Sequence, residues 1–239
     1  MKNYAVIIAG GSGQRMGLEV PKQFVEIGGK SVLAYTLDAF QRHHGIDEIV
    51  VVCIEGWIDE VLSYRETYGL TKLYKVVPGG ASGQESIRNG IFALEGVAAD
   101  DDLVVIHDGV RPIVDSEVLS DVLRVAAKYG NAVTSMPYNE QIFVVDPDDP
   151  STTTQFIPRE TLRRVSTPQC YRFDQIDAGY HEAFETNVGI DGSHYANTMM
   201  VTLGHTLHLA AGSDRNIKLT TRGDLDMFRA YLRRNSVEA

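Results

Sequence analysis

Residues 4–16 read Tyr-Ala-Val-Ile-Ile-Ala-Gly-Gly-Ser-Gly-Gln-Arg-Met. The first six are almost all apolar, which is typical of a parallel strand whose two faces are both covered. The glycines that follow let backbone N–H groups approach an anion closely, and Arg15 and Lys22 add fixed positive charge. A strand that runs into such a loop predicts a phosphate-binding site at the carboxyl end of the strand.

Two well-known phosphate loops do not fit this stretch. A Walker loop needs Gly-Lys-Ser/Thr after four intervening residues, and the dinucleotide fingerprint needs a third glycine where this chain has Met16. An ordinary glycine-rich turn would explain the glycines by themselves. It would not explain Arg15 and the Pro21-Lys22 pair, so we favour the phosphate interpretation.

Composition limits the class of protein. The chain has 239 residues, 44% hydrophobic and 23% charged, as in soluble globular proteins of one large or two small domains. A net charge of -10 disfavours general binding to nucleic acid. An anionic small molecule remains possible if basic side chains gather in one cleft.

Other features point to a cytoplasmic protein without a membrane partner. No apolar run approaches the ~20 residues that a membrane span needs, and the N-terminus leads directly into a strand without a signal peptide. The two cysteines, Cys53 and Cys170, do not form a zinc or disulfide pattern. We expect both to lie in the core, in a reducing compartment.

Strand-like and helix-like runs alternate through the first half of the chain. Strands are expected over 4–9, 48–54, 73–77, 103–106 and 132–136, and helices over 32–40, 57–68, 82–94 and 116–129. This order predicts an α/β fold with a doubly wound, mostly parallel, Rossmann-like sheet. Ligands of such sheets bind beyond the carboxyl ends of the strands, so loops 10–22, 79–86 and 107–112 are expected at one edge.

A change of pattern over about 137–168 indicates an arm inserted into a single domain of residues 1–239. Residues 141–146 and 154–157 are expected to pair as a hairpin. The arm is too small to bury a core of its own, so it is expected to pack on a partner. After it we expect helices over 174–185, 195–203 and 224–233, a strand over 205–211 and an extended run over 216–221.

Five motifs occur in order along essentially the whole chain. They are Gly-Gly-x-Gly-x-Arg-Met at 10–16, Pro-Lys-Gln at 21–23, His-Asp-x-x-Arg-Pro at 107–112, Thr-Pro-Gln at 167–169 and Asn-Ile-Lys-Leu-Thr at 216–220. Together they resemble the CTP-dependent polyol-phosphate cytidylyltransferases. That family includes the 2-C-methyl-D-erythritol 4-phosphate enzymes of isoprenoid synthesis and the ribitol 5-phosphate enzymes of wall and capsule synthesis.

The resemblance implies a reaction without a protein nucleophile. A phosphate oxygen of the polyol phosphate attacks the α-phosphorus of CTP, and pyrophosphate leaves. Catalysis then consists of positioning and charge stabilisation, with Mg²⁺ as the cofactor.

The resemblance also implies roles for individual residues, which we take residue by residue. Arg15, Lys22 and Lys218 match the catalytic cations around the phosphates. Asp108 matches a carboxylate near the Mg²⁺ and the substrate, and Arg159 matches an arginine that reaches from the arm into the neighbouring subunit's site, which implies a homodimer. The nucleotide-binding residues would be Ala9, Gly10, Gly11, Gly13, Gly80 and Ser86.

Each charged residue also has a structural interpretation. Lys218 could be an ordinary solvated surface lysine, and Asp108 could cap a helix. Arg159 could pair with an acidic residue of the arm, Glu160 or Asp149.

Three further groups are expected to be structural. We expect Arg111 to pair with a buried carboxylate. The pairs His43-His44 and His205/His208 are not expected to bind metal, because adjacent histidines point apart on a helix and an i, i+3 pair on a strand straddles both faces.

The acceptor half of the family pattern is altered in this chain. Residues 139–141 are Asn-Glu-Gln where the isoprenoid branch usually has Arg-Asp-Thr, and residues 194–197 are His-Tyr-Ala-Asn where that branch has Thr-Asp-Glu/Asp-Ala. Ala81 stands where an Asp is common in the base loop. These departures favour ribitol 5-phosphate as the acceptor, with 2-C-methyl-D-erythritol 4-phosphate as the alternative.

Three other classes of protein could share part of this pattern. A sugar-1-phosphate nucleotidyltransferase would share the first two motifs but not the other three. A dinucleotide-dependent oxidoreductase would need the completed glycine fingerprint, although Glu55 could serve as its acidic residue. A nucleotide sensor would be expected to lose at least one of Arg15, Lys22 and Lys218, and all three are present.

Overall fold

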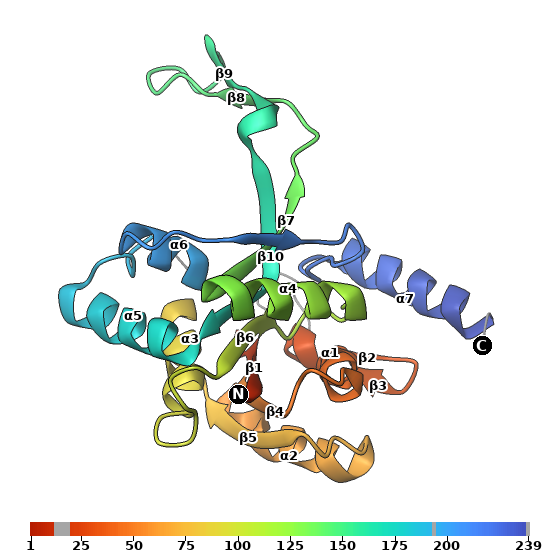
Figure 1. The fold of residues 1–239 in the computed structure, drawn as a ribbon. Coiled ribbons are helices and arrows are strands. Elements are labelled where there is room, and N and C mark those ends of the chain that lie inside the picture. Colours follow the sequence, from red (N-terminus) through yellow and green to blue (C-terminus); the bar gives the residue numbers. More distant parts are fainter. Residues whose placement is uncertain (12–19, 193–194, 238–239) are drawn as a thin grey trace.

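The structure is a computed structural model that describes residues 1–11, 20–192 and 195–237. Within these ranges a seven-stranded sheet forms the centre of the molecule (Figure 1). In order across the sheet, its strands are β11 (Leu209–Ala211), β7 (Asn131–Pro137), β10 (Arg163–Arg172), β6 (Leu103–Asp108), β1 (Asn3–Ala9), β4 (Glu48–Cys53) and β5 (Leu73–Pro78).

The sheet is mostly parallel, as predicted. β1 lies between β4 and β6 and is parallel to both, β5 is parallel to β4, and β11 is parallel to β7. The four parallel strands β1, β4, β5 and β6 therefore end at the same edge of the sheet, where the predicted ligand loops begin.

One strand of the sheet was not predicted. β10 lies between β6 and β7 and is antiparallel to both. Its sequence contains Pro168, and a proline normally argues against a central strand because it lacks the N–H donor. The ladder to β7 is irregular between Ser166 and Gln169, and this irregularity accommodates the proline.

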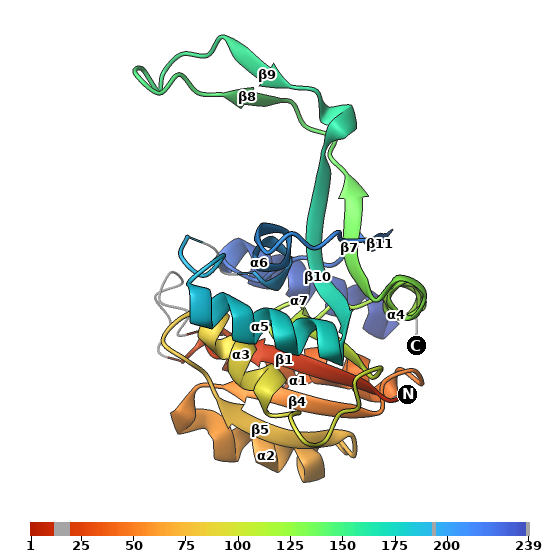
Figure 2. The same cartoon turned by 60° about the vertical axis from the view of Figure 1, so that its left-hand side comes forward.

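Helices cover both faces of the sheet (Figures 1 and 2). On one face the core joins the sheet to α1 (Val32–Arg42), α2 (Ile58–Thr67) and α4 (Ser116–Tyr129). On the other face it joins the sheet to α3 (Gly83–Phe92), α5 (Phe173–Thr186) and α6 (Ala196–Thr202). A third, smaller cluster holds α7 (Arg222–Val237) beside the start of α1. This is the doubly wound arrangement that the alternation of strands and helices predicts.

Local signals explain where several helices begin and end. Ser31 caps α1 by accepting a hydrogen bond from the Ala34 N–H at 3.1 Å, and Ser82 caps α3 in the same way for Glu85. α4 ends at Gly130, whose φ of +90° is a conformation that favours glycine.

Short elements fill the connections. They are the 3₁₀ helices η2 (Lys22–Phe24), η3 (Glu55–Trp57) and η4 (Arg159–Thr161), and the paired strands β2 (Glu26–Ile27) and β3 (Lys30–Ser31). The strand expected over 205–211 is shorter, since only Leu209–Ala211 pairs with β7. Residues 216–221 form no strand and are held by contacts to loops instead.

The predicted hairpin is present and projects from the sheet. β8 (Ile142–Val144) pairs antiparallel with β9 (Gln155–Ile157), and Figures 1 and 2 show this pair far from the α-helices. Its large apolar side chains are uncovered, with Phe156 70% exposed and Phe143 57% exposed. The chain leaves the sheet at the end of β7 and returns at the start of β10.

The prediction that both cysteines lie in the core is confirmed. Cys53 and Cys170 are both buried as free thiols in the core. Across the described ranges, none of the helices combines the length and apolar character needed to cross a membrane.

We predict that Gly90→Ala destabilises the fold. A Cβ at Gly90 would lie 2.4 Å from the Val6 Cγ1 and 2.7 Å from the Val52 Cγ2, and both valines are fully buried. Overpacking of this kind costs about 1–3 kcal/mol, measured here as the free energy of unfolding in urea. Gly56→Ala is the control because a Cβ there meets nothing within 4 Å. Equal stability of the two variants would contradict the close packing of α3 on the sheet.

Candidate active site

A cavity of about 710 Å³ opens at the predicted edge of the sheet. Its wall comes from the ends of β1 and β6, the loop between β5 and α3, η2, the middle of β10, and two segments late in the chain. Of the predicted site residues, those that line it are Ala9, Gly10, Gly11, Lys22, Gly80, Ser86, Asp108 and Lys218. The structure therefore brings together residues that are far apart in the sequence.

Glycines at the ends of β1 and β5 allow the two chains to approach closely. A Cβ on Gly79 would lie 3.3 Å from the Gly10 Cα, and a Cβ on either glycine would lie 3.2 Å from the Ser86 hydroxyl. Ser86 Oγ accepts a hydrogen bond from the Gly80 N–H at 3.0 Å and donates to the Ser82 carbonyl at 2.9 Å. Ser86 thus fixes the shape of the loop that is predicted to read the base.

Gln23 organises the glycine loop, and sequence reasoning gave it no role. Its side chain is 1% exposed, and its Nε2 donates to the carbonyls of Ala9 at 2.7 Å and Gly11 at 2.9 Å. Gln23 therefore holds the end of β1 against η2, which carries Lys22. The sequence signal for this role was the position of Gln23 in the Pro-Lys-Gln motif. A glutamine amide next to a glycine-rich loop can donate hydrogen bonds to the backbone carbonyls of that loop.

Two predicted residues of the first loop, Gly13 and Arg15, lie outside the described residues. Their assignments stay predictions.

A cluster of three charged residues includes two that line the cavity, Asp108 and Lys218. Lys218 Nζ lies 3.0 Å from Asp108 Oδ1, and Arg111 Nε lies 2.8 Å from Asp108 Oδ2. Arg111 also donates to the Asn216 carbonyl at 2.8 Å. The prediction that Arg111 pairs with a carboxylate is confirmed. The alternatives are wrong, because Asp108 caps no helix and Lys218 is not a solvated surface lysine.

The cluster keeps Asp108 ionised. Burial by itself would raise the pKa of Asp108, but the charges of Lys218 and Arg111 outweigh it and lower the pKa to about 2. A permanent negative charge at this place holds two cations at the edge of the cavity.

The Asn-Ile-Lys-Leu-Thr motif at 216–220 reaches the site in a segment that forms no helix or strand. Asn216 Nδ2 donates to the Thr167 carbonyl at 2.6 Å, and the Leu219 N–H donates to the Val110 carbonyl at 2.9 Å. Thr167 Oγ1 in turn accepts a hydrogen bond from the Asp108 N–H at 3.2 Å. Three of the sequence motifs therefore meet in one hydrogen-bonded unit, which explains why their residues occur together.

His107 supports this unit from inside the core. Its ring is 0% exposed, and its Nε2–H donates to the Arg111 carbonyl at 3.1 Å. Burial lowers the pKa of His107 to about 4. The ring is therefore neutral near pH 7 and acts as a hydrogen-bond donor that shapes the loop after β6.

Tyr195 is a wall residue that the sequence marks only as a departure from the family pattern. It comes immediately before α6 and lines the cavity with its side chain half exposed. The Lys218 ammonium lies 5.7 Å from the centre of its ring. This distance is within the range of a cation–π interaction.

Arg159 is not brought to the cavity within one chain. It lies in η4 on the arm, where its Nε is 3.6 Å from Glu160 Oε1 and its Nη1 donates to the Asn139 carbonyl at 3.2 Å. One of its two alternative partners, Glu160, is therefore in contact with it. A role in a partner's site stays a prediction.

Three of the four histidines in these pairs stack on other rings, and one detail of the prediction was wrong. His43 and His44 do not point apart, since their rings stack with centres 5.0 Å apart. α1 ends at Arg42 and His43 is its C-cap, so His43 and His44 do not lie on a continuous helix. His208 stacks on Tyr129, with ring centres 4.4 Å apart.

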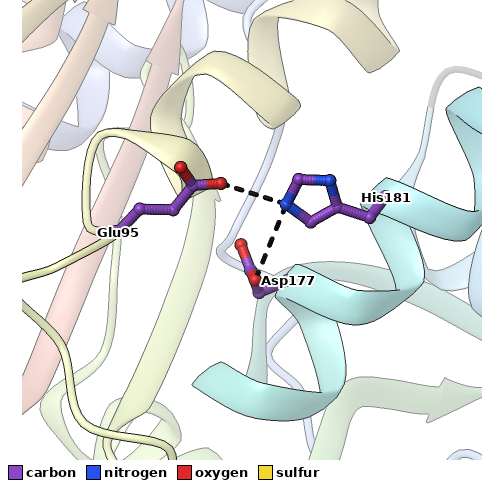
Figure 3. A group of neighbouring side chains, drawn as sticks. All are labelled: Glu95, Asp177 and His181. Carbon is purple, nitrogen blue, oxygen red and sulfur yellow. Dashed lines mark hydrogen bonds and ion pairs between the residues drawn. The ribbon is translucent and has the colours of Figure 1, made fainter.

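Glu95, Asp177 and His181 form a separate polar cluster (Figure 3), and none of the three lines the cavity. His181 Nε2 on α5 is 3.1 Å from Glu95 Oε1 and 3.9 Å from Asp177 Oδ2, and the Phe92 ring stacks on His181. The three donor groups lie within 4.8 Å of one another. His181 is 58% exposed and Glu95 45%, as in surface ion pairs, so we assign the cluster to fastening α5 to the turn after α3.

Taken together, the fold and the cavity define a nucleotide-binding enzyme of the phosphate-transferring type. Glycine loops lie at the carboxyl ends of parallel strands, and fixed cations face the cavity beside them.

Comparison with known proteins defines the family. The family model described as IspD: 2-C-methyl-D-erythritol 4-phosphate cytidylyltransferase matches residues 4–234. The chain belongs to this family of cytidylyltransferases. The predicted enzyme class is therefore confirmed, and the sugar-1-phosphate, oxidoreductase and sensor alternatives are set aside.

Relatives carry two different names. A protein of Lacticaseibacillus paracasei named ribitol-5-phosphate cytidylyltransferase is 53% identical over 96% of this chain and 97% of its own. A protein of Clostridium acetobutylicum named 2-C-methyl-D-erythritol 4-phosphate cytidylyltransferase is 35% identical over 99% of this chain and 100% of its own. The solved structure of 4-diphosphocytidyl-2C-methyl-D-erythritol synthase from Anaerococcus prevotii aligns with a TM-score of 0.81 and 25% identity, covering 97% of this chain and 96% of that one.

We predict that His107 makes the stability of the protein depend on pH. Its pKa in the folded state, about 4, lies below the ordinary value of 6.5, so the unfolded chain binds the proton first as the pH falls. The stabilisation is complete above pH 6.5 and is lost as the pH falls to 4, by about 3 kcal/mol. Unfolding free energies of the wild type and His107→Gln, measured between pH 7 and 4, should differ in slope. Parallel curves would contradict the buried, neutral state of the ring.

Proposed function

We propose that this protein transfers the cytidylyl group of CTP to ribitol 5-phosphate, giving CDP-ribitol and pyrophosphate. The observation that carries the acceptor is the likeness to relatives. The relative named for ribitol 5-phosphate shares 53% of its residues with this chain, and the one named for 2-C-methyl-D-erythritol 4-phosphate shares 35%. The altered stretch at the cavity wall, which includes Tyr195, supports the same choice.

The geometry of the cavity suits an in-line displacement at phosphorus. A phosphate oxygen of the polyol phosphate forms a bond to the α-phosphorus of CTP, and the bond from that phosphorus to the bridging oxygen breaks. Lys22 and Lys218 both line the cavity and come from different parts of the chain, η2 and the segment after β11, so two cations can face the phosphates. At an effective dielectric constant of about 20, one cation ~4 Å from a phosphate charge is worth roughly 4 kcal/mol before desolvation.

The ion cluster prepares Lys218 for this role. Its ammonium is already desolvated in part and oriented by Asp108, so little reorganisation is needed when an anionic substrate arrives. Arg111 binds the second oxygen of Asp108 and keeps the carboxylate in place if Lys218 turns toward a phosphate. We assign Arg111 as a positioning residue rather than a substrate ligand.

The residues present fit a Mg²⁺ ion bound together with CTP. Asp108 is the only carboxylate among the described residues that line the cavity. Mg²⁺ in nucleotide sites takes one or two carboxylates and completes its coordination with phosphate oxygens and water. Asp108 would hold the ion, which when bound would neutralise part of the triphosphate charge.

We further propose that two chains form a homodimer through their arms. The β8–β9 hairpin exposes a set of apolar side chains that nothing within the chain covers among the described residues: Phe143, Val144, Val145, Phe156 and Ile157. An isolated two-stranded hairpin is marginal in water, and contiguous apolar surface of this kind is typical of an interface. Arg159 follows this hairpin directly, so an arm that reaches a second chain would present Arg159 to it.

We predict that pyrophosphate is released from CTP and Mg²⁺ with ribitol 5-phosphate as the acceptor. 2-C-methyl-D-erythritol 4-phosphate is offered in parallel, and the rate is followed with a coupled pyrophosphate assay. Lys22→Ala is the control; it should bind CTP measurably while its turnover falls by about 10²–10³-fold, as for loss of one transition-state donor. Release with the erythritol substrate alone would overturn the acceptor proposal. Release unaffected by Lys22→Ala would overturn the site.

We predict that Lys22→Ala and Arg159→Ala chains complement each other. If Arg159 acts in the neighbouring subunit's site, a heterodimer of the two variants contains one site with neither change. Each homodimeric variant should be nearly inactive, and the heterodimer, purified through two different tags, should regain turnover. A heterodimer no more active than its parents would show that each chain uses its own Arg159 or none.

A further inference from the structure

The position of the Lys218 ammonium depends on side chains rather than on regular structure. Lys218 lies in the segment between β11 and α7, which forms no helix or strand. A lysine has a flexible four-carbon stem, so the ammonium can occupy many positions unless groups around it select one. Asp108 supplies one such group at 3.0 Å, and the ring of Tyr195 lies near the ammonium at 5.7 Å.

The backbone of Tyr195 is anchored to the first turn of α3. Its carbonyl accepts hydrogen bonds from Gln84 Nε2 at 3.3 Å and from Thr198 Oγ1 at 2.9 Å. Gln84 is 1% exposed, and its own Oε1 accepts from the Tyr180 hydroxyl at 2.8 Å. Because Gln84 lies in the first turn of α3, the same side chain ties Tyr195 to the base side of the cavity.

We infer that Tyr195 is a positioning residue that uses the face of its ring to hold the Lys218 ammonium toward the cavity. The inference rests on the proposed function and deepens it by naming the side chain that positions the Lys218 ammonium. An aromatic face attracts a cation through its quadrupole and adds no net charge. In this arrangement Asp108 and the ring together hold the ammonium in place. Because the ring is uncharged, the positive charge of Lys218 can still attract an anionic phosphate.

The first test is steady-state turnover with CTP and whichever polyol phosphate the wild type accepts. Tyr195→Leu should lower kcat about 2- to 5-fold, the effect expected for one partly exposed cation–π contact, with KM for CTP unchanged. Tyr195→Phe, which keeps the ring, should restore most of the loss. If Phe is as damaging as Leu, the hydroxyl rather than the ring matters and the inference fails.

A double-mutant cycle shows whether Tyr195 acts through Lys218. In a Lys218→Ala background, Tyr195→Leu should cost nothing further. An equal loss in both backgrounds would mean that Tyr195 acts on the substrate or the fold directly, which would overturn the inference.

Tyr129 supplies a matched control outside the cavity. It is 48% exposed against 50% for Tyr195, and the Lys128 ammonium lies 4.8 Å from its ring centre. Tyr129→Leu removes the same kind of contact and should leave turnover unchanged.

A second measurement separates failure of this inference from failure of the proposed function, because it needs no substrate. The rate at which an amine-reactive acylating reagent labels Lys218 is followed by peptide mass spectrometry, with Lys128 as the reference. Tyr195→Leu should speed labelling about 2- to 5-fold and Tyr195→Phe should not. Unchanged labelling in Tyr195→Leu would overturn the inference even if the enzyme proves fully active on ribitol 5-phosphate.

Discussion

The carboxylate of Asp108 is the group on which the arrangement of the cavity depends. It lies at the end of β6 and binds Arg111 through one oxygen and Lys218 through the other. Without its charge, two cations would lie close together in a partly buried place with nothing to offset their repulsion or their desolvation. The pair of contacts also joins the loop after β6 to a late segment that has no regular structure of its own. One carboxylate thus sets both the electrostatics and the shape of that wall.

The other wall depends on close approach of backbone instead of on charge. Because Gly10 and Gly79 have no side chains, their backbones lie close to each other and to the Ser86 hydroxyl. Ser86 belongs to the first turn of α3, so these contacts also hold that helix against the ends of β1 and β5. Gln23 then holds the carbonyls of Ala9 and Gly11 at the start of the glycine loop. The cavity therefore combines two different kinds of interaction, close packing of glycines at the ends of β1 and β5 and ion pairing around Asp108.

Much of this could be read from the sequence, because the relevant signals are local or are repeated in motifs. Apolar runs, Ser31 and Ser82 as caps, and Gly130 as a stop place most strands and helices. What sequence reasoning missed depends on tertiary contacts. β10 contains Pro168, a residue that argues against a central strand, and only the irregular ladder to β7 makes it tolerable. Tyr195 gains its role from Lys218 and Gln84, which are distant in the chain, and no pattern of composition or spacing marks such neighbours. Arg159 is the opposite case, since the family resemblance implies a role that one chain by itself does not display.

The place of β10 in the chain has a consequence for how the protein is made. β6 and β7 are not paired with each other, and the strand that fills the gap between them is synthesised only after the β8–β9 hairpin. Until then both carry open edges, and pairing across them is of the long-range kind that slows folding. Gly10, Gly79 and Asp108 come from the first half of the chain, whereas Tyr195 and Lys218 come after the arm. On the ribosome, the carboxylate of Asp108 is therefore made long before Lys218, the lysine with which it pairs.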